Sequence, residues 1–308
     1  MTATMKASVY HEYGAPEVLR LEDVARPLPE TEEVLIRVKA TAVNSADWRL
    51  RKGDPWLARL YFGLSRPRKP ILGTVLAGVV DQIGEGVSRF KPGDEVFGLT
   101  GADRLGAYAE YVCVPETAAL ALKPQNIAFA EAAAVPFGAH TALHFLRKAG
   151  IEAGQAVLVY GASGAVGPAA VQLARHFGAR VTGVCGTDNV ELVRSLGADR
   201  VIDYRREDVD ATAEHYDIIF ETVDKARVSV LVRHLKDEGT LILGAALVKG
   251  MLQGTLFTLG SKKKLVAGIA QERTEDMVFF RELLEAGSLK PVVDRSYPLA
   301  ELPAAHAY

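Results

Sequence analysis

The sequence predicts an α/β protein of two domains, in which an irregular antiparallel β domain is joined to a doubly wound parallel sheet. Three observations support this prediction. The chain has 308 residues, more than one ordinary core holds. Short β-branched runs broken by Gly and Pro fill its first part, and helical stretches alternate with short apolar strands after residue 125. The alternation of helical stretches and strands ends near residue 272. We therefore expect one domain at residues 1–125 and 273–308, and the other at residues 126–272.

Composition excludes several classes of function. The formal net charge of -2 provides no excess of Lys and Arg for nucleic acid or an anionic membrane, so a small molecule is the expected partner. Cys113 and Cys185 have no CxxC spacing, which excludes a disulfide framework and a cysteine zinc cluster. Neither a signal-peptide pattern nor a run approaching the ~18 apolar residues of a membrane span is present. We therefore predict a cytoplasmic protein.

The first domain begins with apolar runs such as VLIRVKATAV, LAGVVDQIG and AEYVCV. Turn sequences such as RPLPE and KPGDEV separate these runs, which is typical of an antiparallel β domain. One helix is expected at residues 46–52, and a second at residues 273–287, where RTEDMVFFRELLEAG ends on glycine.

The second domain contains six predicted strands. Their alternation with helical stretches predicts a parallel doubly wound sheet. The last strand is apolar between polar turns, and such an exposed edge favours pairing with a second copy, so we predict a homodimer joined across it. The six strands are AVLVYG, RVTGVC, RVIDY, DIIFETV, TLILGA and KLVAGIA, at residues 156–161, 180–185, 200–204, 217–223, 240–245 and 264–270.

A glycine-spaced turn follows the first of these strands and opens a helix near Pro168. Gly164 allows the backbone to approach a pyrophosphate, Gly167 allows close packing of helix and strand, and the helix N-terminus attracts phosphate. The turn predicts a dinucleotide site. A purely structural turn is the alternative, because Ala162 replaces the first glycine of the usual GxGxxG pattern. The residues assigned to the cofactor here are Ala162, Ser163, Gly164, Ala165, Val166 and Gly167.

Six motifs in order resemble the medium-chain dehydrogenase/reductase superfamily, and within it the zinc-free quinone-oxidoreductase branch. They are AVNSADWR, GTVLAGVV, GDEVFG, GAYAEYVCVP, AAAVPFGAHTALHFL and VYGASGAVGPAAVQLA. The resemblance extends from Met5 to Tyr308 and implies a GroES-like β-barrel catalytic domain, a Rossmann domain and an active-site cleft between them. Members of the family usually continue past PAAHAY with a final strand, so we expect either a truncated chain or a barrel with one open edge.

The resemblance also implies that the protein binds no metal. Positions that supply zinc ligands in related enzymes correspond here to Asn44, Thr74 with Val75, and Phe137, none of which offers a thiolate or imidazole. Without a Lewis acid, hydrogen-bond donors must polarise the acceptor, which suits quinones and alkenes conjugated to a carbonyl. We predict an NADPH-dependent reductase of such compounds. The alternative is an NADPH-binding structural or sensing protein without significant turnover.

Several side chains are assigned by the same resemblance. Asn44 lies beside the nicotinamide, where its amide donates to the acceptor oxygen, or it only holds a backbone turn. Arg51, Tyr61 and Phe137 line the substrate pocket, although Arg51 is alternatively a solvated helix charge. Asp47 is expected to make a structural hydrogen bond. Further cofactor contacts are assigned to Thr141, Val223, Gly244 and Ala245.

The tip of the second strand predicts NADPH rather than NADH. NAD-specific folds place an acid there, about 20 residues past the glycines, to bind the ribose 2'-hydroxyl. This strand instead ends in Cys185, Gly186 and Thr187, so Gly186 leaves room for a 2'-phosphate and Thr187 can donate to it. By the resemblance, Asp188 points away from the ribose and Asn189 replaces a lysine. Tyr204 matches a phosphate-contacting position with Arg205 or Arg206 adding charge, or it only caps a strand.

Overall fold

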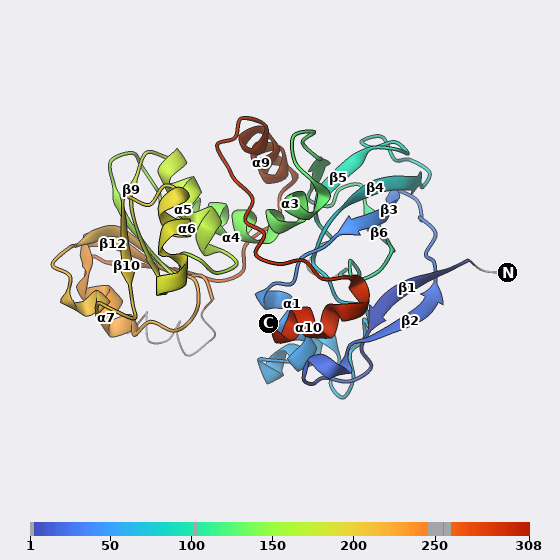
Figure 1. The fold of residues 1–308 in the computed structure, drawn as a ribbon, viewed down its shortest axis with the longest axis horizontal. Helices are drawn as coiled ribbons and strands as arrows, with labels where there is room; N and C mark the ends of the chain where they lie inside the picture. Colours follow the sequence, from blue (N-terminus) through green and yellow to red (C-terminus); the bar gives the residue numbers. More distant parts are fainter. Residues whose placement is uncertain (1–2, 102–103, 246–254, 256–259) are drawn as a thin grey trace. The chain divides into compact units, whose positions relative to one another are not determined.

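The computed structural model describes residues 3–101, 104–245, 255 and 260–308 and divides the chain into two compact units (Figure 1). The barrel unit comprises residues 1–137, 272–287 and 291–308, and the Rossmann unit comprises residues 138–271 and 288–290. The first crossing between units falls after Phe137 rather than after residue 125. The reason is that helix α3 (Phe129–Ala134) packs against the main sheet of the barrel unit.

The barrel unit contains the predicted antiparallel β structure. Strands β1 (Thr4–Val9) and β2 (Arg20–Ala25) form a two-stranded sheet. Five further strands pair antiparallel in the order β6-β3-β4-β5-β7. Their inward apolar side chains, among them Ile36, Leu76 and Val112, form one core. These strands are β3 (Glu33–Ala40), β4 (Val75–Ile83), β5 (Glu95–Leu99), β6 (Tyr111–Pro115) and β7 (Leu120–Leu122).

Both predicted helices of this unit are confirmed. The first is α1 (Ser45–Lys52), which Gly53 ends in a left-handed conformation at φ 64°. The second is α9 (Thr274–Glu285), which packs against β7. The remaining helical segments are η1 (Pro16–Val18), η2 (Trp56–Ala58), α2 (Arg59–Phe62), η5 (Leu299–Glu301) and α10 (Leu302–Ala307).

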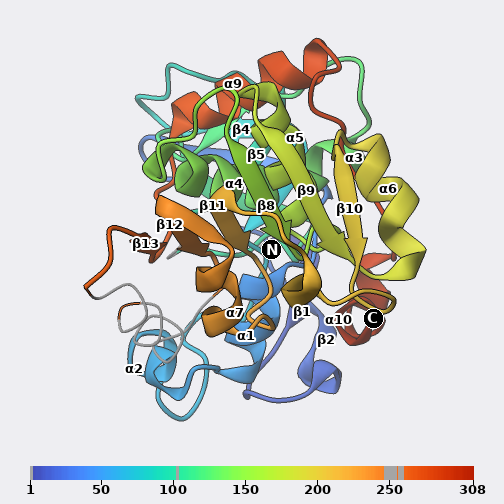
Figure 2. The ribbon, with the colours of Figure 1, turned by 90° about the vertical axis from the view of Figure 1, so that its left-hand side faces the viewer.

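The Rossmann unit contains a six-stranded parallel sheet in the order β10-β9-β8-β11-β12-β13, and Figure 2 shows the strands side by side. All six predicted strands are present. The chain order reverses between β8 and β11, and ligands of open α/β sheets bind at the carboxyl edge of such a reversal. The strands are β8 (Ala156–Tyr160), β9 (Arg180–Cys185), β10 (Arg200–Asp203), β11 (Tyr216–Glu221), β12 (Leu235–Leu243) and β13 (Lys264–Ala267).

Helices connect and cover these strands. The helix α5 (Gly167–His176) packs against β8 and β9, and α6 (Val190–Ser195) packs against β9 and β10. The unit also contains α4 (Pro136–Lys148), which begins at the unit boundary, and α7 (Val228–Arg233), with short turns η3 (Thr187–Asn189) and η4 (Val209–Ala211). No helix among the described residues is long and apolar enough to cross a membrane.

Strand β13 lies at the edge of the sheet and is shorter than predicted. It pairs with β12 over Lys264–Ala267, whereas the sequence predicted a strand to Ala270. Gly268 ends it with a φ of 129°, a conformation outside the β region, and Ile269 beyond it is 89% exposed.

Candidate dinucleotide-binding site

The glycine turn begins one residue earlier than predicted, at Gly161. This residue turns the chain away from β8 with a φ of 85°, and its N–H and that of Ala162 donate to the carbonyl of Val184 at 3.1 and 2.9 Å. The N–H of Gly164 then donates back to the carbonyl of Gly161 at 3.1 Å. Gly161 is not among the predicted cofactor residues, although its position directly after an apolar strand is a usable signal.

The two predicted glycines of the turn serve different purposes. A Cβ on Gly167 would lie 2.1 Å from the carbonyl oxygen of Gly161, so glycine is needed there for α5 to approach the end of β8. A Cβ on Gly164 would meet only the oxygen of Gly161 at 3.5 Å and Cγ1 of Val223 at 3.7 Å, which are ordinary contacts. The fold therefore does not itself require glycine at 164. An uncovered backbone at the start of α5 is what a pyrophosphate needs.

The loop after β11 is fixed against this turn. Thr222 donates its hydroxyl to the carbonyl of Tyr160 at 2.8 Å. The Glu221 carboxylate is 1% exposed and accepts from the backbone N–H groups of three following residues at 2.9 to 3.2 Å. Burial raises the pKa of Glu221 above its usual range. These bonds hold Val223, an assigned cofactor residue, beside Gly161 and Gly164.

Other assigned cofactor residues lie at the same carboxyl edge. Gly244 and Ala245 follow β12, and the N–H of Gly244 donates to the carbonyl of Glu221 at 2.9 Å. Helix α4 reaches the turn at Gly138, where a Cβ would lie 2.2 Å from the carbonyl oxygen of Ala165. Thr141 is half-buried about one helical turn further along α4.

The tip of β9 carries no acid where NAD-specific folds have one. Gly186 is extended there, at φ −84° and ψ 163°. A Cβ on it would lie 3.1 Å from the hydroxyl of Tyr204 and 3.5 Å from Nε of Arg205. The Tyr204 side chain is 54% exposed beyond the end of β10. The structure therefore brings Gly186, Tyr204 and Arg205 together.

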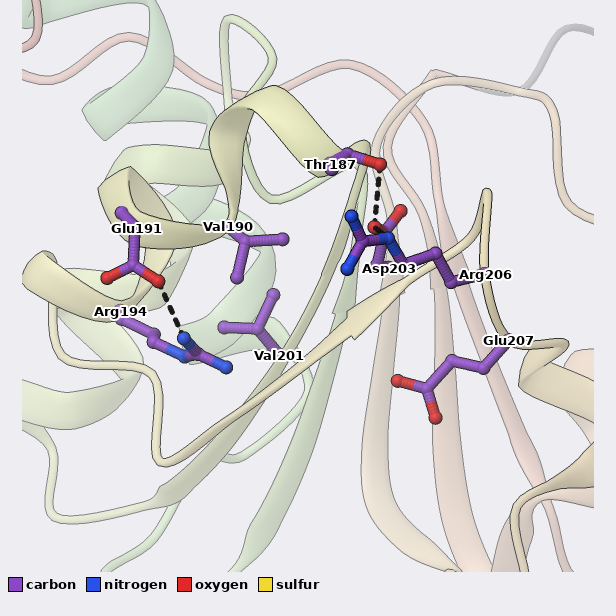
Figure 3. Close-up of a pocket in the computed structure, with 8 residues that line it drawn as sticks. All are labelled: Thr187, Val190, Glu191, Arg194, Val201, Asp203, Arg206 and Glu207. Atoms are coloured by element: carbon purple, nitrogen blue, oxygen red, sulfur yellow. Dashed lines mark hydrogen bonds and ion pairs between the residues drawn. The ribbon is translucent and has the colours of Figure 1, made fainter.

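Thr187 lies at this tip but its proton is already engaged. Its hydroxyl donates to Oδ2 of Asp203 at 2.7 Å, which lowers the pKa of that carboxyl, and Nε of Arg206 lies 3.4 Å from the same oxygen (Figure 3). The prediction that Thr187 donates to a phosphate therefore has no support in this arrangement. Asn189 ends the short turn η3, and its backbone N–H donates to the carbonyl of Gly186 at 3.0 Å. A hollow of about 380 Å³ adjoins Asp203, lined by Thr187, Val190, Glu191, Arg194, Val201, Asp203, Arg206 and Glu207.

Asp188 forms an ion pair with Arg205. Its Oδ2 lies 3.0 Å from Nη1 of Arg205, and the two side chains are 77% and 56% exposed. The sequence pattern does not predict this ion pair. A second hollow, of about 590 Å³, is lined by Tyr160, Tyr204, Arg205, Lys225 and Arg227, among others.

In the barrel unit, Asn44 caps helix α1. Its Oδ1 accepts from the N–H of Ala46 at 2.9 Å and of Asp47 at 3.3 Å, and its Nδ2 donates to Oγ1 of Thr74 at 2.6 Å. The alternative expectation, that Asn44 holds a backbone turn, is confirmed. Its role as a donor to substrate stays a prediction.

Asp47 makes the structural hydrogen bonds expected of it. It is fully buried and accepts from the N–H of Gly73 at 3.3 Å and from the hydroxyl of Thr74 at 3.5 Å. Burial raises its pKa to about 7. A partly buried polar chain thus leads from Asn44 through Thr74 to Asp47.

The three residues assigned to the substrate pocket lie in different environments. Arg51 is 2% exposed, and it donates to the carbonyl of Gly14 at 2.7 Å and to Nδ1 of His306 at 3.3 Å. The alternative that Arg51 is a solvated charge is therefore wrong, and burial lowers its pKa. Tyr61 on α2 is 63% exposed, and Phe137 is half-buried at the start of α4. Their shared pocket stays a prediction.

Over the described ranges, no group of three His, Cys, Asp or Glu side chains could hold a metal ion. Both cysteines are free thiols.

Comparison with known proteins defines the family. Residues 30–125 match the model of the alcohol dehydrogenase GroES-like domain, and residues 196–308 match that of zinc-binding dehydrogenases. The chain is 35% identical to 2-methylene-furan-3-one reductase of Solanum lycopersicum over 96% of this chain and 73% of that one. It is 34% identical to an NADPH-dependent alkenal/one oxidoreductase of Arabidopsis thaliana over 99% and 76%, and 32% identical to human quinone oxidoreductase over 98% and 93%.

A solved structure agrees with these relatives. The quinone oxidoreductase from Coxiella burnetii superposes with a TM-score of 0.90 at 27% identity, covering 99% of this chain and 95% of that one. The fold and the relatives define an oxidoreductase that uses a nicotinamide cofactor. The chain belongs to the medium-chain dehydrogenase/reductase superfamily, in its zinc-free, quinone-oxidoreductase-like branch.

Proposed function

We propose that the protein is an NADPH-dependent reductase of quinones or of alkenes conjugated to a carbonyl. The observation that carries the choice of cofactor is the tip of β9, where Gly186 replaces an acid and Tyr204 and Arg205 gather around it. The names of two relatives, a quinone oxidoreductase and an NADPH-dependent alkenal/one oxidoreductase, support the choice of substrate.

The Rossmann unit would hold the cofactor along its carboxyl edge. The pyrophosphate would lie over Gly164 at the start of α5, because the backbone there is uncovered. The nicotinamide half of the cofactor would contact Thr141, Val223, Gly244 and Ala245. When bound, NADPH would supply a hydride, and the protein would bind and orient the acceptor.

The proposed contribution of Asn44 is a hydrogen bond to the acceptor oxygen. Its amide carries two hydrogens, of which one is donated to Thr74 at 2.6 Å, and the other is the proposed donor. The cap on α1 and the bond to Thr74 fix the orientation of the amide, so the donor would be preorganised for charge that develops on oxygen. We propose that water protonates the product.

Consumption of NADPH with a panel of simple quinones and enones tests the function. We expect turnover with at least one class, and a preference for NADPH over NADH of at least about tenfold in kcat/KM, or ~1.4 kcal/mol. Tight NADPH binding without turnover on any acceptor would instead support a structural or sensing role. Equal use of the two cofactors would contradict the proposed role of the β9 tip.

We also propose that the protein is a homodimer and that it acts in the cytosol. Strand β13 pairs with β12 on one side, and within the described part of the chain no strand pairs with its other side. Two free cysteines suit a reducing compartment.

A further inference from the structure

We propose that Arg205 binds the 2'-phosphate of NADPH and that Asp188 positions Arg205 for this task. The pair thereby sets the dinucleotide preference, because Asp188, two residues beyond Gly186, is paired with Arg205 rather than left to bind a ribose hydroxyl. This inference rests on the proposed function and names the residues that select the cofactor.

The geometry places Arg205 between the acid and the phosphate position. Its Nη1 lies 3.0 Å from Oδ2 of Asp188, while its Nε lies 3.5 Å from the point that a Cβ of Gly186 would occupy. That point marks where NAD-specific folds begin their selective acid. A guanidinium has five N–H donors in a planar fork, so pairing with Asp188 leaves donors for a phosphate.

Two other polar side chains at this corner, Thr187 and Arg206, are bound to the same acid. Asp203 holds both the hydroxyl of Thr187 at 2.7 Å and Nε of Arg206 at 3.4 Å. Asp203 also accepts from the backbone N–H of Arg205 at 3.0 Å, which holds the backbone of Arg205 in place. The two neighbouring arginines are therefore paired with different acids. Arg205 is the one beside Gly186.

Asp188 has two opposing effects on a bound 2'-phosphate. It repels the phosphate, and it also holds Arg205 in place, so less side-chain freedom is lost when the phosphate binds. Its attraction raises the pKa of Arg205. Both side chains are largely exposed, so neither substitution should disturb the fold.

Calorimetric binding of 2',5'-ADP and 5'-AMP to the full chain tests the assignment without any turnover. We expect Arg205→Ala to weaken 2',5'-ADP by about tenfold or more, as for a lost hydrogen bond to a charged group, and to leave 5'-AMP unchanged. Arg206→Ala removes the same charge one position along and should change the ratio of the two affinities less than about twofold. Equal losses in both variants would overturn the assignment of Arg205.

A double-mutant cycle tests the positioning role of Asp188. In the Arg205→Ala background, Asp188→Asn should strengthen 2',5'-ADP binding, because only repulsion is removed. With Arg205 present the same substitution should give a smaller gain or a loss. An equal or larger gain would show that Asp188 only repels the phosphate or competes with it, which overturns positioning. If the unmodified protein does not prefer 2',5'-ADP over 5'-AMP, the proposed NADPH preference itself fails, a result that is separate from the variant comparison.

Discussion

Adding one methyl group at either of two glycines should separate the packing role of the turn from its binding role. In Gly167→Ala the new Cβ would lie 2.1 Å from the oxygen of Gly161 and within 2.6 Å of two backbone atoms of Ala162. Backbone atoms cannot turn aside as a side chain can, so α5 must move away from β8. Overpacking costs about 1–3 kcal/mol, and we expect the upper end here.

Gly164→Ala should behave differently. The nearest atoms to its Cβ lie at 3.5 and 3.7 Å, and the residue has no positive φ, so the stability should stay within about 1 kcal/mol of the unmodified protein. The methyl group would nevertheless cover the backbone where the pyrophosphate is proposed to lie. Loss of one charged hydrogen bond there is worth about 1.5–3 kcal/mol, so NADPH binding should weaken by roughly tenfold to a hundredfold.

Thermal unfolding and fluorescence titration with NADPH measure the two effects on the same samples. For a chain of 308 residues that unfolds in one transition, a loss of about 3 kcal/mol should lower the unfolding midpoint of Gly167→Ala by roughly 5 °C, while that of Gly164→Ala changes little. Separate roles for the two glycines would be contradicted if Gly164→Ala binds NADPH as tightly as the unmodified chain, or if it is destabilised as much as Gly167→Ala.

Three further predictions concern other parts of the chain. The pKa of Asp47 rises from 3.8 to about 7 on folding, so the contribution of Asp47 to native stability should fall as pH rises from about 4 to 7, by at most ~4 kcal/mol; urea unfolding of the unmodified protein and of Asp47→Asn should differ by this pH-dependent amount. Gly186→Asp should weaken NADPH by up to ~4 kcal/mol, a Coulomb bound at an effective dielectric near 20, and unchanged affinity in a titration would contradict the proposed phosphate position. Light scattering should show a dimer at micromolar concentration, whereas an active monomer would rule out pairing through β13.

Features with a local signal were predicted well. Strand β8, the turn and α5 follow one another within about 20 residues, and apolar runs, glycines and Pro168 mark each boundary. The end of β13 was placed too late, because Gly268 ends the strand through its backbone conformation while the apolar pattern continues to Ile269. The compact units divide later in the chain than the predicted domain boundary, since the packing of α3 on the barrel sheet leaves no mark in the local pattern.

Partners distant in sequence could not be predicted from the pattern. Arg51 lies on a short polar helix, a position typical of a solvated charge. Its guanidinium nevertheless donates to His306, 255 positions away. The pKa shift of Asp47 likewise depends on complete burial of its side chain and on bonds from Gly73 and Thr74, which the fold brings to it. In both cases the residue type alone does not reveal the role, which depends on the groups that the fold places around the side chain.

The tip of β9 shows why a rule based on the presence or absence of an acid is incomplete. Two acids lie close to Gly186 in the fold, and each is bound to a particular partner: Asp203 to Thr187 and Arg206, Asp188 to Arg205. A carboxylate that already accepts from an arginine is a weaker acceptor for a ribose hydroxyl, and a hydroxyl that already donates is a weaker donor to a phosphate. Cofactor preference at such a site therefore depends on which hydrogen-bonding groups remain uncommitted, and that is decided by pairings between the ends of neighbouring strands.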